Sequence, residues 1–185
     1  MSENVLFALF VTSILSGNIV LQQLYGAAPF LGFASKSKGI TAMGAIVSAV
    51  LVACVVASYP LCKALDNAGM GYLNIMAIVA VVLALVFVFE GIAKGSGMKL
   101  GVYLPLIAFN SAIPAACIVC STAGLTFETA FVQAVGMGLG YWLSLYLING
   151  VYARIDMKSV PKAFRGLPII VMAAAILSMA MYAFK

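Results

Sequence analysis

One acidic residue, Glu90, stands where a carboxylate is costly to place and is therefore a candidate for function. It directly follows the apolar run 86–89 and precedes Lys94 by four residues. A carboxylate near the end of a membrane helix can strip part of the hydration shell of a hard cation and replace it with oxygen. The same spacing also allows an ion pair between Glu90 and Lys94 on one helix face. The sequence leaves both roles open.

Two asparagines, Asn18 and Asn110, lie in apolar stretches that Gly and Pro interrupt. Backbone groups freed by such interruptions must be satisfied inside the protein, and matched interruptions point to a functional midplane. With Glu90, the two amide oxygens form a candidate ion pathway. The alternative is an ordinary kink whose polar residues bond between helices. The interrupting features are Ser16-Gly17-Asn18, Gln22-Gln23 and residues 26–32 in the first stretch, and Pro105, Asn110-Ser111 and Pro114 in the second.

Cysteine is the other residue type with ligand chemistry. Cys117 and Cys120 are three residues apart and share a helix face, and Cys54 is the one plausible further ligand nearby. Two thiolates do not complete a metal site, and the chain contains no His. We predict no metal site, no catalytic residue and no cofactor-binding residue in this chain.

Six apolar stretches position these residues, each long enough at about 1.5 Å per residue to cross a hydrocarbon layer of roughly 30 Å. Hydrophobic residues make up 65% of the 185 residues and charged residues 8%. This composition predicts a single integral membrane domain, 1–185, and accounts for the net charge of +5 without nucleic acid. The stretches are Val5–Leu24, Ile40–Leu61, Leu73–Phe89, Leu100–Cys120, Ala130–Val151 and Leu167–Phe184.

Positive charge falls in alternate loops, which predicts the orientation. The first, third and fifth loops should face the cytoplasm, and both termini should lie outside. Only Lys63 and Lys185 are on the other side. The eight cytoplasmic residues are Lys36, Lys38, Lys94, Lys99, Arg154, Lys158, Lys162 and Arg165.

The chain divides near Gly95-Ser-Gly into halves of three spans each. An odd number of spans per half makes the second half enter the membrane from the opposite side. We therefore predict an all-α membrane protein with six transmembrane helices, as two inverted three-helix repeats over about 1–96 and 97–185. Helices 1 and 4 are the interrupted ones. Gly136-Met-Gly138-Leu-Gly140, and Gly44 with Ser48, favour close helix packing over a ligand site.

Three segments resemble the RnfA/NqrE membrane subunits of the Rnf and Na⁺-translocating NADH:quinone oxidoreductase complexes. Residues 17–32, GNIVLQQLYGAAPFLG, are similar to the family's first span, and residues 103–112, YLPLIAFNSA, to its fourth. Residues 160–168, VPKAFRGLP, resemble its loop between spans 5 and 6 and favour the RnfA type. The resemblance implies a pseudo-symmetric pair with an opposite-oriented RnfE/NqrD-like homologue. It also implies a shared [2Fe–2S] cluster in the middle of the membrane, which passes electrons between cofactors on the two faces.

The chain departs from this pattern at the cluster ligands. Ala28 and Ser111 stand where the resemblance implies cysteines. Ala28 has no ligand atom, and a Ser hydroxyl is a much poorer iron ligand than a thiolate. Cys117 is six residues beyond Ser111, about 9 Å along a helix, and is too far to substitute. We expect this chain alone to supply no iron ligand.

The sequence thus predicts an integral membrane subunit of an Rnf/Nqr-like complex in a bacterial or archaeal cytoplasmic (inner) membrane, supporting redox-driven Na⁺ or H⁺ transport. Flavin-bearing and iron–sulfur partner subunits would carry the cofactors, since this chain has no nucleotide motif and no soluble domain. The alternative is a six-span small-molecule carrier or substrate-binding transport component. A purely structural scaffold is a third interpretation.

Overall fold

In the computed structural model, every regular element within residues 3–26, 37–95, 110–122, 124–156 and 158–183, which are the residues described, is helical. The predicted all-α class is confirmed for this part of the chain. The helices are α1 (Glu3–Ile14), α2 (Ile19–Gln23), α4 (Ser37–Asn67), α5 (Asn74–Gly95), α7 (Ala112–Thr122), α8 (Phe127–Arg154) and α9 (Leu167–Tyr182), with short 3₁₀ turns η1 (Gly71–Leu73) and η3 (Lys162–Phe164).

Within the described residues, three helices are long and apolar enough to cross a membrane. Their spanning segments are Met43–Asn67 in α4, Gly71–Phe89 in η1 and α5, and Phe127–Arg154 in α8. The apolar helices α1, α7 and α9 are shorter. The described residues therefore form an apolar, all-helical protein with candidate membrane spans, while the six-span inverted repeat stays a prediction.

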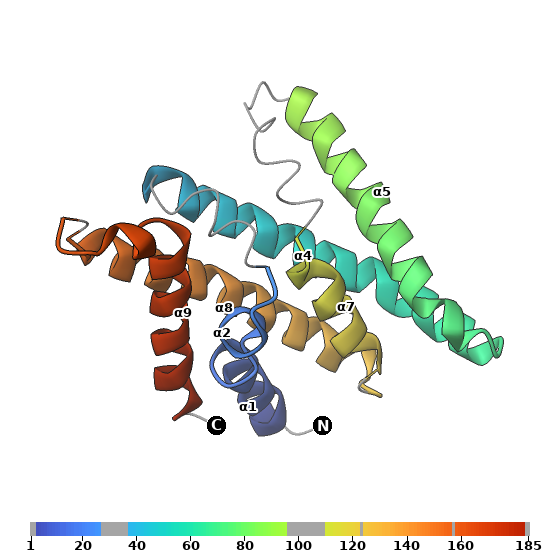
Figure 1. Ribbon diagram of the computed structural model, residues 1–185. Coiled ribbons are helices and arrows are strands. Elements are labelled where there is room, and N and C mark those ends of the chain that lie inside the picture. The colour runs from blue at the N-terminus through green and yellow to red at the C-terminus, as the bar shows by residue number, and fades with distance from the viewer. Residues whose placement is uncertain (1–2, 27–36, 96–109, 123, 157, 184–185) are drawn as a thin grey trace.

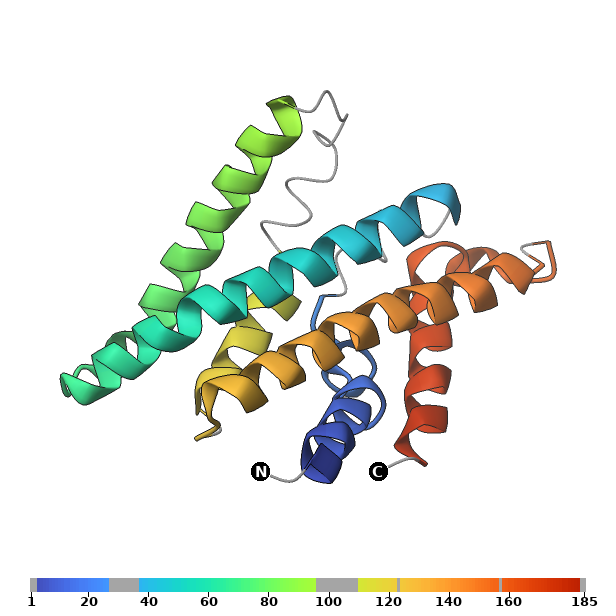
Figure 2. The same ribbon diagram turned by 180° about the vertical axis from the view of Figure 1, so that it is seen from behind.

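The helices assemble around α8 and α4, which lie side by side across the middle of the molecule (Figures 1 and 2). The interrupted pair α1 and α2, together with α9, packs on α8. Helix α7 packs mainly on α4 and also touches α8. Because α8 contacts elements from both halves of the sequence, it is the element that positions the candidate residues.

Glycines on α8 permit this close assembly, as the sequence predicts. A Cβ on Gly136 would lie 2.7 Å from Ser13 Cβ of α1, and one on Gly140 would lie 3.0 Å from Ile14 O. Gly138 faces α4 instead, where the Ser48 hydroxyl donates to its carbonyl at 2.6 Å. The three glycines therefore serve two helix contacts at once.

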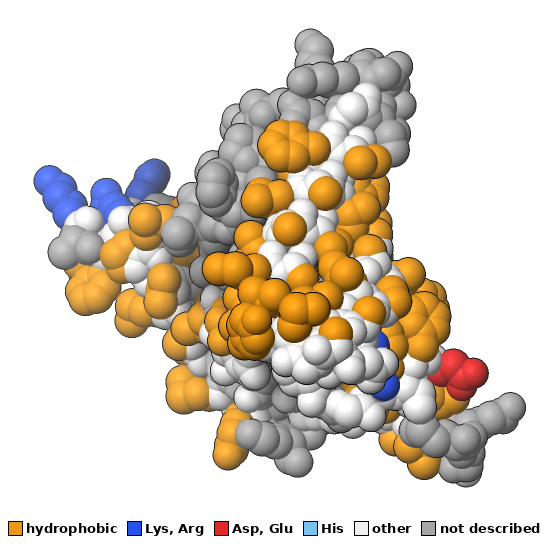
Figure 3. All heavy atoms as spheres, turned by 90° about the vertical axis from the view of Figure 1, so that its right-hand side faces the viewer, with side chains coloured by type: hydrophobic (Ala, Val, Ile, Leu, Met, Phe, Trp, Pro, Cys, Tyr) orange, Lys and Arg blue, Asp and Glu red, His pale blue; other side chains and the backbone are white. Residues whose placement is uncertain are grey.

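Helix α5 stands away from the rest of the bundle and packs on α4 and α7 (Figure 1). Only 17% of the residues in its most apolar 18-residue window are buried, against 44% for α4 and 50% for α8. Hydrophobic side chains cover the surface on this side of the molecule, and Lys and Arg gather at one end of the view (Figure 3). In a membrane such a face contacts lipid or another apolar protein surface.

Two prolines, Pro114 and Pro60, lie within helices that do not end at them. Pro114 lies in the first turn of α7, where its missing N–H has no intrahelical role. Pro60 lies within α4, and the helix continues through it. Pro105 lies outside the described residues. The helix start at Ala112 is instead set by the preceding asparagine.

Candidate functional site

The first apolar stretch is interrupted at residues 16–18, and Asn18 ends the interruption. Helix α1 stops at Ile14, and α2 restarts at Ile19. The Asn18 side chain accepts hydrogen bonds from Val20 N at 3.1 Å and Leu21 N at 3.2 Å. Its backbone is extended, with φ −65° and ψ 112°, as an N-cap requires. An asparagine thus replaces the helical ladder at the break predicted from the sequence.

The same amide group joins both sides of the break to α8. Asn18 Nδ2 donates to Ile14 O at 3.0 Å and to Gly140 O at 2.9 Å. Ser144 Oγ lies 2.9 Å from Asn18 Oδ1 and donates to it. Asn18 and Ser144 are both fully buried. In a medium without water, this mutual satisfaction makes an irregular backbone tolerable.

A buried asparagine also precedes the helix α7 in the second stretch. Asn110 Oδ1 accepts from Ala112 N at 3.1 Å at the start of α7, and Asn110 Nδ2 donates to the Tyr141 hydroxyl at 2.9 Å. Asn110 is 1% exposed, as is Tyr141. Each half of the chain therefore caps a helix with a buried asparagine and ties it to the 140–144 segment of α8.

The two interrupted stretches also touch each other directly. Gly26 N donates to Ser111 Oγ at 2.9 Å. Gly26 has φ +78°, and a Cβ there would lie 2.7 Å from Asn110 Oδ1 and 2.8 Å from Tyr141 Cε2. Only glycine fits this backbone conformation and this close approach. We call Asn18, Gly26, Asn110, Ser111, Gly140, Tyr141 and Ser144 the midpoint cluster.

The candidate ion-pathway residues are only partly brought together. Asn18 and Asn110 meet the same segment of α8, and Ser111 lies beside them. Glu90 lies in the last two turns of α5, a helix that packs on α4 and α7, and its side chain lies outside the described part. Ala28 also lies outside the described residues. Asn18 Oδ1, one of the candidate cation ligands, already accepts three hydrogen bonds.

The sequence does not single out Gly26, Tyr141 and Ser144 as members of one site. An aromatic residue such as Tyr141 in a membrane helix is typical of packing or of the interface, yet it is buried and bonded to Asn110. A sequence signal does exist, since Gly140 and Ser144 stand four residues apart on one helix face. That spacing predicts a polar contact but does not identify its partner. The partner of Gly140 O is Asn18, which is 122 residues away in the sequence.

The four cysteines lie elsewhere. Cys54 and Cys62 on α4, and Cys117 and Cys120 on α7, are buried and free. Cys120 Sγ donates to Ala130 O at 3.8 Å, which ties α7 to α8. Across the residues that the structure describes, no three His, Cys, Asp or Glu side chains are grouped so as to hold a metal ion. The cysteines therefore pack α4 against α7 as small apolar groups.

Comparison with known proteins decides the family. A family model described as "Rnf-Nqr subunit, membrane protein" matches residues 6–185. The chain belongs to the Rnf-Nqr family. It is 32% identical to the A subunit of the Na⁺-translocating ferredoxin:NAD⁺ oxidoreductase complex of Acetobacterium woodii, over 97% of this chain and 96% of that protein. The A subunit of the ion-translocating oxidoreductase complex of Syntrophotalea carbinolica is 32% identical over 97% and 95%, and that of Cereibacter sphaeroides 30% over 96% and 95%.

The midpoint cluster of this Rnf-Nqr chain does not suit the [2Fe–2S] cluster that the resemblance implies. At Ser111 the available atom is a hydroxyl oxygen that accepts a hydrogen bond from Gly26 N. The neighbouring groups are neutral amides, a phenol and backbone carbonyls, none of which replaces a thiolate as an iron ligand. Chemically, the midpoint cluster is a network of neutral oxygen and nitrogen groups that hydrogen-bond to one another. This network fixes the starts of α2 and α7.

Proposed function

We propose that this chain is the A-type membrane subunit of an Rnf-like ion-translocating oxidoreductase complex and supports redox-driven Na⁺ or H⁺ transport. The observation that carries the proposal is similarity along nearly the full length, 97% of this chain and 96% of the Acetobacterium woodii relative. The break between α1 and α2, which meets the start of α7 at a buried polar cluster, adds support, because discontinuous helices are typical of ion-handling membrane proteins. The carrier alternative has no such observation in its favour.

The proposal includes six spans, outer termini and an opposite-oriented homologous partner subunit in a cytoplasmic membrane. Helix α1 begins and α9 ends at the same end of the bundle (Figure 1). Helix α8 ends and α9 begins at the opposite end, where the joining segment carries Lys158, Lys162 and Arg165. This arrangement is consistent with basic residues retained on the cytoplasmic side.

In this proposed function, the described residues hold helices in place and do not themselves transfer electrons. Asn18 and Asn110 fix the starts of α2 and α7, and the 140–144 segment of α8 holds both starts together. A cation that passes the break would meet amide, hydroxyl and carbonyl oxygens, the groups that hard cations prefer. Glu90, on α5, would supply the charged group near the cytoplasmic surface.

Affinity purification from native membranes tests the assignment. A tagged chain should co-isolate with flavin-bearing and iron–sulfur membrane subunits and with a second chain of the same family. Vesicles that contain the isolated complex should take up Na⁺ or H⁺ when supplied with electron donor and acceptor. Co-isolation with an ATPase module in place of redox subunits would instead support the carrier alternative.

The orientation gives a direct prediction. Tags at Met1 and Lys185 should be accessible from outside intact cells, and a tag between Arg154 and Arg165 should be accessible only from the cytoplasm. The physical reason is that basic loops of this length are retained on the cytoplasmic side. Protease protection or tag labelling in intact and inverted vesicles measures it. Cytoplasmic labelling of both termini contradicts the prediction.

The absence of thiolates at Ala28 and Ser111 gives a second prediction. We expect this chain, purified alone, to contain no iron and to show no [2Fe–2S] electron paramagnetic resonance signal. The double variant Ala28→Cys/Ser111→Cys supplies two thiolates at these positions. The matched comparison is the iron content of this variant when it is purified together with its partner chain. Stoichiometric iron in the unmodified chain would show that other residues ligate the metal.

A further inference from the structure

A groove lies on the outer surface of α8, near the C-terminal end of that helix. It has a volume of about 580 Å³ and follows residues 146–154, with Tyr146, Asn149, Gly150 and Arg154 along it. Gly150 leaves the space open, because a Cβ at this position would meet no atom within 4 Å. Tyr146 is 64% exposed and Arg154 is exposed as well, so no described residue covers this face. We call this surface the α8 groove.

The α8 groove changes from apolar to charged along the helix axis. Tyr146 and Val151 supply apolar surface, and Arg154 lies at the end of the groove, where the candidate membrane span of α8 also ends. Residues 146–154 extend about 12 Å along a helix, and one leaflet is about 15 Å deep, half of a hydrocarbon layer of roughly 30 Å. The groove therefore matches one phospholipid in length and polarity, with an acyl chain beside the apolar part and a headgroup at the guanidinium.

The Arg154 side chain has no counter-charge in the protein. It makes no hydrogen bond or ion pair with any residue that the structure describes. Residues 154–165 contain four basic residues and a single acid, Asp156. Asp156 Oδ1 accepts a hydrogen bond from Lys158 N at 3.0 Å, which closes a turn within this segment. A guanidinium at a membrane surface, followed by further basic residues, attracts the phosphate of an anionic lipid.

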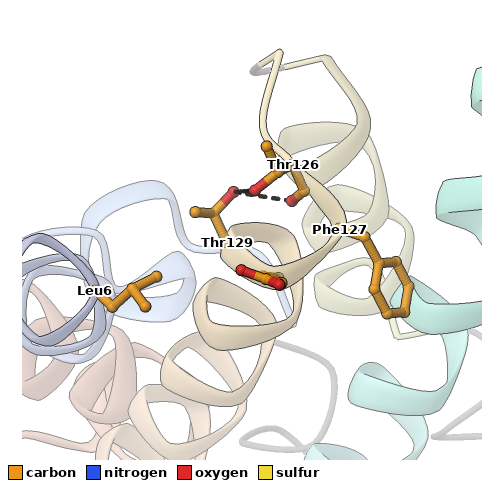
Figure 4. A pocket seen from close by; sticks show the side chains of 5 residues that line it. Leu6, Thr126, Phe127 and Thr129 are labelled. Atoms are coloured by element: carbon orange, nitrogen blue, oxygen red, sulfur yellow. Dashed lines mark hydrogen bonds between the residues drawn. The ribbon is translucent and has the colours of Figure 1, made fainter. Parts of the chain in front are cut away.

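The hollow at the opposite end of α8 carries the opposite charge. It has a volume of about 350 Å³ and is lined by Leu6 of α1 and by residues 126–129 (Figure 4). Phe127 points away from Leu6, and the charged group of this pocket is the exposed carboxylate of Glu128 (Figure 4). A carboxylate repels a phosphate. Charge complementarity thus selects the α8 groove over this pocket for an anionic lipid.

We propose that the α8 groove binds one anionic phospholipid, with its phosphate at Arg154 and an acyl chain against Tyr146 and Gly150. The inference requires a membrane but not ion transport, so it goes beyond the proposed function and does not depend on it. The competing account is that the basic residues only fix the orientation of the chain. That account requires neither a particular headgroup nor the open space at Gly150.

Photolabelling of the assembled complex in native membrane vesicles tests the site. The probe is phosphatidylglycerol with a diazirine in one acyl chain, and phosphatidylcholine with the same chain is the matched zwitterionic probe. Mass spectrometry should find at least about fivefold more adduct on residues 146–154 from phosphatidylglycerol, because each basic residue near the surface favours an anionic lipid by about that factor. Free glycerol phosphate should not compete, because it has no acyl chain.

One variant fills the groove without changing any charge. Gly150→Phe places a ring where the acyl chain would lie, and it should abolish the preference for phosphatidylglycerol at normal complex abundance. Gly91→Phe is the matched control, because Gly91 is a helical glycine of α5 whose Cβ would also meet no atom within 4 Å. The control should label residues 146–154 as the unmodified complex does.

A second variant removes the charge and leaves the groove open. Arg154→Gln should lower phosphatidylglycerol labelling about fivefold, while Arg154→Lys keeps most of it. Arg154 is exposed, so folding is not at stake. Lys63→Gln removes one positive charge elsewhere, from a side chain 5.4 Å from the centre of the Tyr59 ring, and should change nothing.

Equal labelling by the two lipid probes, or undiminished labelling in Gly150→Phe, overturns the proposal. Labelling by neither probe shows that a partner subunit covers the groove, which also overturns it. Competition by free glycerol phosphate assigns Arg154 to a soluble anion in place of a lipid. Failure of the complex to move ions refutes the proposed function and leaves the labelling result as it stands.

Discussion

Asn18→Ala is expected to destabilise the folded subunit by about 2–4 kcal/mol. The change removes the cap of α2, leaves Val20 N and Leu21 N without their side-chain acceptor, and removes the amide donor to Ile14 O and Gly140 O. These groups are buried, so water does not replace the lost bonds. Loss of abundance in membranes and a lower unfolding temperature in detergent measure the effect.

Two milder variants separate the cap from the link to α8. Asn18→Ser retains a cap acceptor but loses the donor to Gly140 O, and it should cost about half as much. Ser144→Ala removes one hydroxyl and leaves the cap intact, with an expected cost of about 0.6 kcal/mol, typical of hydrogen bonds between membrane helices. An Asn18→Ala protein as stable as Ser144→Ala would show that the cap contributes little.

The sequence predicts the position of this break but not its partners. Gly17 beside Asn18 marks an interrupted helix, and the structure ends α1 at Ile14 and begins α2 at Ile19. The acceptor on α8, Gly140 O, is a backbone atom, and no residue pattern in a single sequence identifies which backbone carbonyl will face a given side chain. For the same reason, the sequence does not identify Tyr141 as the partner of Asn110.

Helix contacts based on small residues are predicted more completely. Gly44 lies against Trp142 and Ser48 bonds to Gly138 O, so the small residues on α4 and α8 meet as their spacing suggests. This success has a physical basis, because a glycine in a membrane helix leaves a groove that a second helix must fill. Helix ends are predicted less well. Helix α4 extends from Ser37 to Asn67, beyond both expected limits, because helical hydrogen bonding continues past the apolar residues.

The relation between the two halves is only partly visible in the sequence. Asn18 is the N-cap of α2, and Asn110, two residues before α7, accepts a hydrogen bond from the first backbone N–H of that helix. The contact between Gly26 and Ser111 then brings the two stretches together near the positions where the resemblance implies metal ligands. The contact between Gly26 and Ser111 forms although Ser111 is not a cysteine. This indicates that the contact positions the two stretches without a metal ligand at Ser111.

Glu90→Gln is expected to slow ion uptake by the assembled complex at least about tenfold, which corresponds to roughly 1.4 kcal/mol of lost stabilisation for the moving cation. Gln keeps the shape of the side chain and one carbonyl oxygen but removes the charge. A hard cation that leaves water near the end of α5 depends on that charge to offset its desolvation. Uptake in vesicles, with complex abundance measured in parallel, gives the result. Asp156→Asn is the matched control, because Asp156 is an exposed carboxylate in the basic segment after α8.

The competing account makes Glu90 a surface carboxylate paired with Lys94 four residues later on α5. Such a pair contributes at most about 1 kcal/mol to stability and nothing to ion movement. It predicts normal uptake in Glu90→Gln, and it predicts that Lys94→Gln and Glu90→Gln change stability equally. The ion-handling role predicts instead that Glu90→Gln lowers uptake while Lys94→Gln, which leaves the carboxylate in place, does not. Normal uptake by Glu90→Gln at normal abundance excludes Glu90 from the pathway, because a charge that assists a cation across a barrier cannot be removed without raising that barrier.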